Sequence, residues 1–300
     1  MAADAMNFSI TKAFHKEPYP SISPSRPELS QAGRNVLITG GGGGIGFHAA
    51  KAFLQASAAK VVIVGRREDV IKAAATQLGK DFPKSQVIGL QCDIAKSADV
   101  ERVWDVLKTK GIYIDVLVLN AAVAPKTFGP LIELSAKEVK DVYAVNMFGC
   151  LEMTQYFHKQ EGSSAGATKY LVHVSTVAAH NFPVASHMYA YGLSKNAGAL
   201  ALQLVAQDTK PEVMQVVTFN PGPVFTPGAA GTGVKEGDLA FNSGPTFQAS
   251  SLYGLPPPEA AFLHGRFVWN EWDVDEMKSG DLRKKIDENP TFLQIGVHGI

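Results

Sequence analysis

The amino-acid sequence predicts an α/β fold: a doubly wound parallel β-sheet with helices on both faces. First, six short apolar runs alternate with amphipathic stretches between residues 34 and 219. Parallel strands buried on both faces form continuous apolar runs, and helical crossovers join them. Second, five consecutive glycines follow the first apolar run directly. The sequence contains no internal repeat of solenoid length. The continuous order of strands and helices therefore predicts a single domain with N- and C-terminal extensions.

The predicted strands and helices follow one another in a regular order. Each strand is a short apolar run that ends at glycine or polar residues, and each helix has an apolar stripe with helical spacing. The six strands cover residues 35–39, 60–64, 86–91, 115–119, 169–175 and 214–219. The helices between them cover residues 45–56, 69–78, 98–108, 135–157 and 187–207.

The segments at the two ends lie outside this pattern. Residues 1–33 contain four prolines that exclude a long helix, which leaves either a packed arm or a partly ordered tail. Residues 34–258 form the predicted main domain. Its last part, residues 221–258, is rich in Gly, Pro and Ser and is expected to form a loop over a pocket. Residues 259–300, with a charged helix near 274–288, are expected to pack on the domain.

The bulk composition narrows the class of protein. Lys plus Arg and Asp plus Glu both number 28, so a nucleic-acid binder that works by bulk charge is not expected. The two cysteines, Cys92 and Cys150, are too few for a disulfide framework and fit a reduced, cytoplasmic setting. No apolar run reaches about 18 residues, and the first residues lack a secretory pattern, so no membrane association is expected.

The glycine-rich segment between the first strand and the first helix predicts a phosphate site. Glycine lets the backbone turn sharply and approach a ligand closely, and the start of a helix presents unpaired N–H groups. Gly40, Gly44, Ile45 and Gly46 are the predicted contacts for a pyrophosphate. The strand–loop–helix order is typical of Rossmann-like dinucleotide-binding folds.

The end of the second strand indicates which dinucleotide is bound. An acidic residue there would bind the ribose hydroxyls of NAD, and none is present at residues 61–67. Arg66 instead offers a guanidinium that suits a 2′-phosphate, so NADP is predicted and NAD is the alternative. Glu68 and Asp69 are the nearest carboxylates and would weaken this prediction.

Tyr191 and Lys195 are the candidate acid–base pair. Residues four apart share one face of a helix, so the phenol and the ammonium can face one pocket. A nearby cation favours the phenolate, so the pKa of Tyr191 is expected to fall. Tyr189 has Leu193 four residues on and therefore lacks such a partner. No metal site is predicted, because His180 and His187 have no accompanying ligand cluster.

Together these motifs resemble the short-chain dehydrogenase/reductase family over about residues 34–230. The departures are Leu119 and Ala122 around Asn120, and Thr176 where the family usually has a second serine. The terminal extensions are similar to those of a fungal branch that modifies secondary metabolites. The matching segments are Thr39–Gly46, Asp93–Ile94, Asn120–Ala121, Val145–Asn146, Tyr191–Lys195 and Asn220–Thr226.

The resemblance implies a role for each matching residue. Tyr191 would transfer a proton to or from the substrate oxygen, Lys195 would bind the nicotinamide ribose, and Asn146 would hold a water. The hydroxyl that holds the substrate oxygen would come from Thr176, with Ser175 as the alternative. The remaining cofactor contacts would be Asp93, Ile94, Asn120, Pro221, Gly222, Val224 and Thr226.

The function predicted from these residues is NADP(H)-dependent oxidoreduction of a ketone or secondary alcohol. A small apolar substrate is expected because the pocket loops carry Phe182, Val184, Met188, Phe225, Phe241 and Phe247. One alternative is an enzyme of the same fold without net redox chemistry: an isomerase, dehydratase or cyclase. Another is a non-catalytic NADP sensor. The resemblance also implies a homodimer or homotetramer that pairs through the helices at 135–157 and 187–207.

Overall fold

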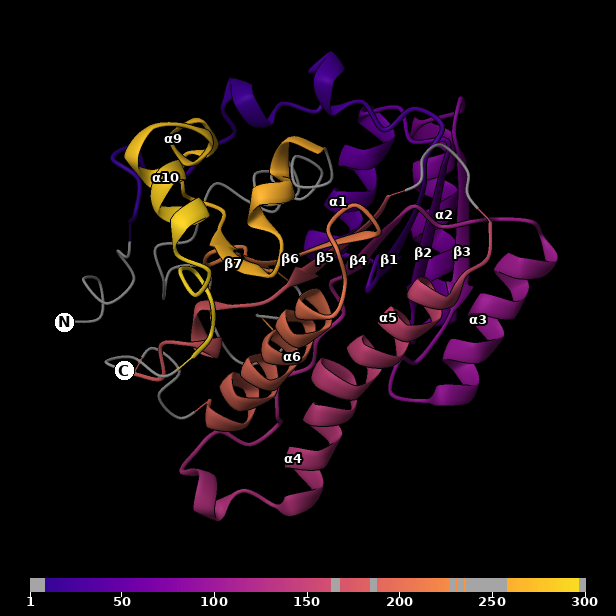
Figure 1. Cartoon of the computed structure of the whole chain (residues 1–300). Coiled ribbons are helices and arrows are strands. Elements are labelled where there is room, and N and C mark those ends of the chain that lie inside the picture. Colours follow the sequence, from indigo (N-terminus) through magenta and orange to yellow (C-terminus); the bar gives the residue numbers. More distant parts are fainter. Residues whose placement is uncertain are drawn as a thin grey trace.

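The chain folds around one seven-stranded parallel sheet, which confirms the predicted fold class (Figure 1). The computed structural model describes residues 9–162, 168–183, 188–226, 230, 235 and 258–296. The strand order β3-β2-β1-β4-β5-β6-β7 reverses direction between β1 and β4, where a doubly wound sheet binds its ligand. The strands are β1 Asn35–Thr39, β2 Lys60–Gly65, β3 Gln86–Gln91, β4 Val116–Leu119, β5 Lys169–Val174, β6 Met214–Asn220 and β7 Arg266–Trp269.

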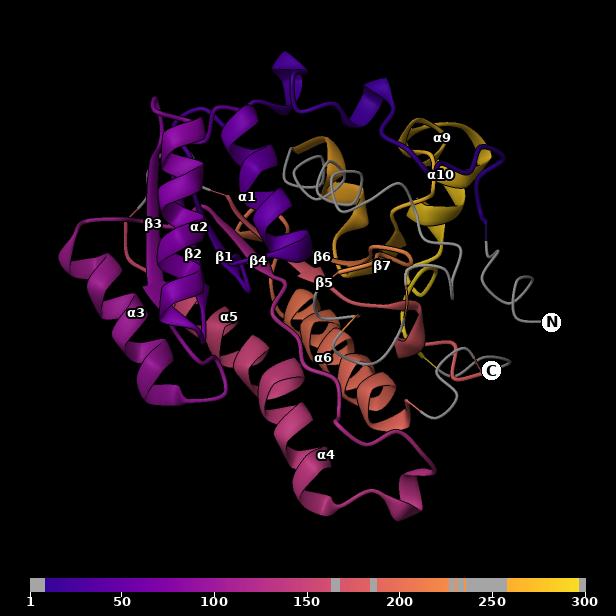
Figure 2. The same ribbon diagram turned by 180° about the vertical axis from the view of Figure 1, so that it is seen from behind.

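Helices cover both faces of the sheet (Figures 1 and 2). Alternate residues of one strand enter opposite cores: Val36 and Ile38 pack in the core under α1 and α2, whereas Leu37 packs in the core under α3, α5 and α6. This alternation is why the strands read as continuous apolar runs. The helices are α1 Gly44–Gln55, α2 Glu68–Asp81, α3 Ser97–Thr109, α4 Ala136–Tyr143, α5 Cys150–Lys159 and α6 Tyr189–Gln207.

The helix predicted at residues 135–157 is interrupted in its middle. Ser135 caps its start by accepting a hydrogen bond from the Glu138 amide at 3.2 Å. The segment Ala144–Gly149 then winds as a π-helix between α4 and α5. Segments of this kind are frequent at functional sites, and this one contains Asn146.

The C-terminal segment contributes a strand that the sequence analysis did not predict. Arg266–Trp269 forms β7 and pairs with β6 at the edge of the sheet. Arg266 is buried, and its guanidinium donates to the carbonyls of Phe262, Ile286 and Asn289. The charge of Arg266 is therefore matched by carbonyl oxygens and does not prevent burial.

Two short helices and a histidine complete this segment. The charged helix predicted near 274–288 is two helices, α9 Val274–Lys278 and α10 Gly280–Glu288, because the chain turns at Gly280 with φ +64°.

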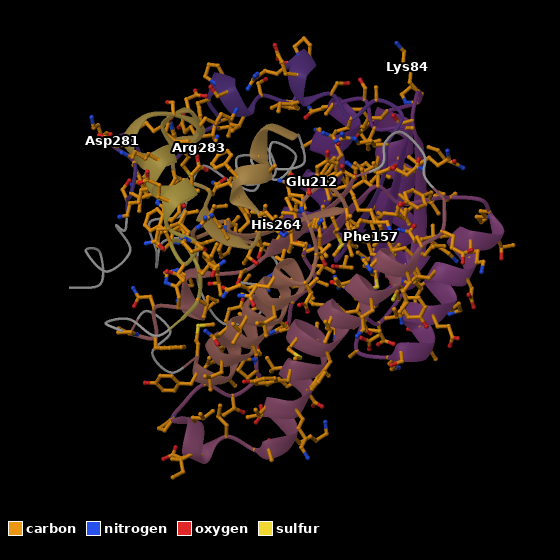
Figure 3. All side chains as sticks on the ribbon, in the orientation of Figure 1. Lys84, Phe157, Glu212, His264, Asp281 and Arg283 are labelled. Carbon is orange, nitrogen blue, oxygen red and sulfur yellow. The ribbon has the colours of Figure 1, made fainter. Side chains whose placement is uncertain are left out.

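His264 lies between the C-terminal segment and the end of α6 (Figure 3). Its Nε2 donates to the carbonyls of Ala206 and Thr209, both at 2.8 Å.

The N-terminal arm packs on the C-terminal segment from residue 9 onward. Nε2 of His15 lies within hydrogen-bond distance of the Asp273 carboxylate, at 2.7 Å, and the Val274 amide donates to the Tyr19 hydroxyl at 3.0 Å. Burial raises the pKa of Tyr19 above its usual range. The arm from residue 9 onward and the C-terminal segment thus lie against each other, in the part of the molecule where α9 and α10 lie in Figure 1. Among the described residues, no helix has the length and apolar character needed to span a bilayer.

Candidate functional site

The glycine-rich loop lies between β1 and α1, at the carboxyl edge of the sheet. Gly40 has φ +69°, a conformation that side chains disfavour. A Cβ at Gly46 would lie 2.4 Å from the Gly40 carbonyl oxygen, so only glycine fits there. In the described part of the chain no side chain caps the start of α1 at Gly43, which leaves its first N–H groups available to an anion.

Thr39 and Asn120 hold this loop in shape. The Asn120 amide group donates to the carbonyls of Thr39 at 2.9 Å and Gly40 at 3.3 Å. In return the Thr39 hydroxyl accepts from the backbone amides of Asn120 and Ala121. Asn120, predicted as a cofactor contact, therefore connects β4 to the loop through its side chain.

Arg66 follows β2 and is exposed. Within the described ranges, its guanidinium has no hydrogen bond or ion pair, so it can bind an anionic group. Of the two nearest carboxylates, Glu68 pairs with Lys72 at 2.7 Å and is thus engaged on its own helix. Asp69, the other carboxylate that would weaken the NADP prediction, is exposed in the first turn of α2.

Asp93 and Ile94 follow β3 at the same edge. Asp93 is half-buried, and its Oδ1 accepts from the Ala95 amide at 3.2 Å. The backbone amide of Asp93 donates to Asp99 at 2.8 Å, and this contact holds the pKa of Asp99 below its usual range. Ile94 is buried beneath the turn.

The Pro221–Gly222 segment after β6 extends to the glycine-rich loop. The Asn220 side chain accepts from the Val177 amide at 3.0 Å, which ties the end of β6 to the turn after β5. A Cβ at Gly44 would lie 3.3 Å from the Thr226 methyl carbon, so Thr226 lies against the glycine-rich loop. Val224 between them is buried. Most of the predicted loop 221–258 is outside the described residues.

Lys195 is buried in α6 with only 1% of its surface exposed. Its ammonium donates to the Val174 carbonyl at 2.6 Å and lies 3.3 Å from Nε2 of His173. Burial lowers the pKa of Lys195 to about 8, and the nearby Cys150 thiol acts in the opposite direction. Lys195 can therefore change its charge close to neutral pH.

Tyr191 lies one turn before Lys195 and is half-buried. Burial raises the pKa of its phenol to about 12. The pKa was expected to fall, and that expectation is wrong for the chain alone. Spacing on one helix face does not ensure a contact: among the described residues the Lys195 ammonium bonds to β5, and no hydrogen bond joins it to the phenol.

Asn146 is fully buried in the π-helical segment. Its Oδ1 accepts from the Val123 amide at 2.9 Å, and its Nδ2 donates to the Val123 carbonyl at 2.8 Å. The same Nδ2 donates to the Ser194 hydroxyl at 2.9 Å. The side chain of Asn146 therefore joins three elements of the site, and both of its N–H groups are used.

The two candidate hydroxyls differ in access. Ser175 is 4% exposed, and its buried hydroxyl oxygen has no hydrogen-bond partner in the described part of the chain. Thr176 is half-buried, and its hydroxyl oxygen accepts from the Ala178 amide at 3.3 Å. Since that oxygen accepts a hydrogen bond, its own hydrogen stays available to donate.

The described pocket candidates lie near this edge, and the others fall outside the described residues. Phe182 is 44% exposed, whereas Met188 and Phe225 are half-buried. His180 is an exposed residue whose Nε2 accepts from the Trp269 indole at 3.3 Å, so β7 contacts the turn after β5. The pocket candidates outside the described residues are Val184, Phe241 and Phe247, and His187 is outside them as well.

Sequence reasoning missed two buried residues of the site, His173 and Ser194. Ser194 precedes Lys195, and it donates to the Tyr191 carbonyl at 2.8 Å. Its place inside the Tyr191–Lys195 motif was a signal that could have identified it. His173 lies within an apolar strand, where no local pattern marks a contact to a helix residue.

The residues present fit a dinucleotide. A Cβ at Gly43 would meet no described atom within 4 Å, so the loop is open there; Gly43 provides no side-chain cap for α1, and Arg66 is available. All three features lie at the carboxyl edge near the reversal of strand order. In the described ranges, no group of three His, Cys, Asp or Glu side chains could hold a metal ion.

Comparison with known proteins supports the family that these features define. The sequence model of the short chain dehydrogenase family matches residues 34–236. The chain is 30% identical over 293 residues to the short chain dehydrogenase/reductase AacuD of Aspergillus aculeatus, and the match covers 96% of both chains. It is 32% identical over 291 residues to a short chain dehydrogenase/reductase of Claviceps purpurea, covering 96% of this chain and 94% of the relative. The chain belongs to the short chain dehydrogenase family.

A solved structure shares the fold. The L-sorbose reductase of Gluconobacter frateurii, complexed with NADPH and L-sorbose, aligns with a TM-score of 0.69 at 18% identity. The alignment covers 81% of this chain and 96% of the reductase. At 18% identity this match shows a common fold and no more. The family assignment rests on the family model and the fungal relatives.

Proposed function

We propose that this protein is an NADP(H)-dependent oxidoreductase that interconverts a ketone and a secondary alcohol of a small apolar substrate. The observation that carries the proposal is the position of Tyr191 and Lys195. They lie on α6, next to the end of β5, at the sheet edge that also holds the glycine-rich loop. A proton donor and a dinucleotide site thus share one edge of the sheet.

Each side chain has a definite task in this reaction. Thr176 donates a hydrogen bond to the substrate oxygen, and Tyr191 gives that oxygen a proton or takes one from it. Lys195 donates to the nicotinamide ribose with the hydrogen that Val174 and His173 leave unused. When bound, the nicotinamide supplies or accepts the hydride. Asn146 acts as a positioning residue through Ser194.

Thr176 is the better candidate for the substrate-binding hydroxyl. The oxygen of Ser175 is inaccessible to solvent, so a substrate could reach it only after a rearrangement of the strand end. Thr176 is partly exposed, and the Ala178 amide fixes the orientation of its hydroxyl. A preoriented donor stabilises charge on an oxygen better than one that must reorient.

The preference for NADP rests on Arg66. An exposed guanidinium that forms no ion pair with a described residue matches the geometry of a phosphate. NADH would lack that contact. The apolar substrate is supported by the half-buried Met188 and Phe225, and a secondary metabolite fits the fungal relatives.

Isotopic transfer tests this function directly. The protein is incubated with a panel of apolar ketones and NADPH that carries deuterium at either face of nicotinamide C4. With one of the two labelled cofactors we expect one deuterium on the carbinol carbon for each NADPH consumed, and with the other none, because the hydride leaves from one face of C4. Product formation without NADPH consumption would indicate an isomerase, dehydratase or cyclase. NADPH binding without turnover across the panel would indicate a sensor.

We also propose that the protein is a homodimer or homotetramer. Its subunits would pair through α6, α5 and the π-helical segment that precedes α5. Phe148 and Leu204 support this arrangement, since 60% and 50% of their surfaces are exposed. Apolar residues exposed on neighbouring helices are suited to a subunit interface. Sedimentation of Phe148→Glu should show monomers where the wild-type protein shows oligomers. A wild-type monomer at micromolar concentration would contradict the proposal.

A further inference from the structure

His173 lies directly beneath the candidate active site. It is in β5, has no exposed surface, and faces the core that α6 covers. The neighbouring strand positions are Leu119 in β4 and Thr218 in β6. His173 is thus a buried polar residue between an apolar neighbour and a polar one. Burial of a polar ring is costly unless its nitrogens are hydrogen-bonded.

The ring of His173 makes one polar contact within the described residues. Its Nε2 lies 3.3 Å from the Lys195 ammonium nitrogen. An ammonium group can only donate, so Nε2 must accept, and the proton of the neutral ring is then on Nδ1. Nδ1 has no hydrogen-bond partner among the described side chains and backbone groups. Since the ring keeps an unpartnered nitrogen, its contact with Lys195 is the polar interaction that can offset its burial.

We infer that His173 is a positioning residue that, with the Val174 carbonyl, fixes the Lys195 ammonium and its charge for the reaction. This inference rests on the proposed function, because it deepens the role of Lys195 in that site. Two acceptors from adjacent positions of β5 take two of the three ammonium hydrogens. The third is left for the cofactor, so the direction of Lys195 is set before binding.

The electrostatic surroundings of Lys195 agree with this role. The ionisable groups around it are His173 from β5, Cys150 from α5 and Tyr191 from α6. Burial and the lysine charge lower the pKa of His173 well below its usual range, so the ring remains a neutral acceptor. Burial raises the pKa of the Cys150 thiol, which therefore adds no anion at neutral pH. The acceptors of β5 thus hold the ammonium by hydrogen bonds, which its charged form can donate.

The test measures the ionisation of Lys195 without cofactor or substrate. In protein labelled with ¹⁵N-lysine, the Nζ resonance of Lys195 is assigned by its absence in Lys195→Met and followed against pH. We expect a midpoint near pH 8 in the wild-type protein. His173→Leu removes the acceptor and should increase the acid dissociation constant of Lys195 about tenfold. His173→Gln keeps an acceptor and should remain within about twofold of the wild type.

Thr218→Val is the matched control, since Thr218 is the neighbour of His173 in β6 and has no bond to Lys195. It should leave the titration unchanged. The inference is overturned if His173→Leu titrates like the wild type, even when its thermal stability changes, because that result describes a purely structural residue. Failure of the oxidoreductase proposal would appear separately, as absence of deuterium transfer with the titration intact.

Discussion

The Asn146 amide donates to the Ser194 hydroxyl across 2.9 Å, and this bond joins the π-helical segment to α6. Ser194 in turn donates to the carbonyl of Tyr191. The backbone of Tyr191, the proposed proton donor, is therefore connected through Ser194 to Asn146 in the π-helical segment. Asn146 also closes two hydrogen bonds with Val123, so one side chain holds the segment after β4 and α6 together.

Removal of the Asn146 side chain should destabilise the protein more than removal of the Ser194 hydroxyl. Asn146→Ala removes the partner of the Val123 N–H and C=O groups and the donor to Ser194, and should cost about 2–3 kcal/mol, whereas Ser194→Ala should cost about 1 kcal/mol. Urea denaturation of both variants and of the double variant measures these losses and their coupling. Equal losses for the two single variants would show that the contacts with Val123 contribute nothing.

Arg66→Ala should weaken NADPH binding about 10- to 100-fold and NADH binding less than about threefold. The reason is that only NADPH carries the phosphate that a guanidinium would bind. Fluorescence titration with both cofactors gives the two affinities. Arg67→Ala, an exposed arginine one position along, is the control and should change the ratio of affinities little. Equal losses for both cofactors in Arg66→Ala would remove the basis for the NADP preference.

The hydroxyl of Thr176 should matter for turnover, and that of Ser175 should not. Thr176→Val keeps the shape of the side chain and removes the donor, so kcat should fall about 10²- to 10³-fold. Thr176→Ser and Ser175→Ala should retain most of the activity. Steady-state kinetics of the three variants decide the matter. The opposite ranking would assign the role to Ser175, whose buried oxygen would then have to become accessible.

Lys195 should lower stability at neutral pH. Its folded-state pKa of about 8 is below the ordinary value of 10.5, so the unfolded chain binds more protons between these values and stability rises with pH there. Lys195→Met should be more stable than the wild type at pH 7, by about 2–3 kcal/mol, and the difference should shrink from pH 8 to pH 10. Urea denaturation at several pH values tests this. A difference in unfolding free energy that stays constant across that pH range would show that burial does not lower the pKa of Lys195.

The sequence predicted the sheet well where strands are continuous apolar runs. Lys60–Val64 and Gln86–Gln91 agree with β2 and β3 within one residue. It failed at β7, because the strand begins with the charged Arg266, which the fold buries by hydrogen bonds to carbonyls such as that of Ile286. The π-helical segment was also missed, since nothing in the local sequence separates it from the helices on either side.

For the site, motifs predicted which residues meet but not how they contact one another. The spacing of Tyr191 and Lys195 placed them on one helix, and the structure adds that the ammonium bonds to β5. His173 could not be predicted, because its contact with Lys195 joins residues 22 positions apart through tertiary packing. The direction of the Tyr191 pKa was mistaken for the same reason: burial is a property of the folded molecule.

The most direct test of the account compares Tyr191→Phe with Tyr189→Phe. Both variants lose one phenol from α6, but only Tyr191 has a lysine one turn further along. Turnover of Tyr191→Phe should fall at least about 10²-fold while NADPH affinity and thermal stability stay close to those of the wild type. Tyr189→Phe should retain most of its turnover. Full turnover in a folded, NADPH-binding Tyr191→Phe variant would contradict the proposed proton donor and with it the mechanism.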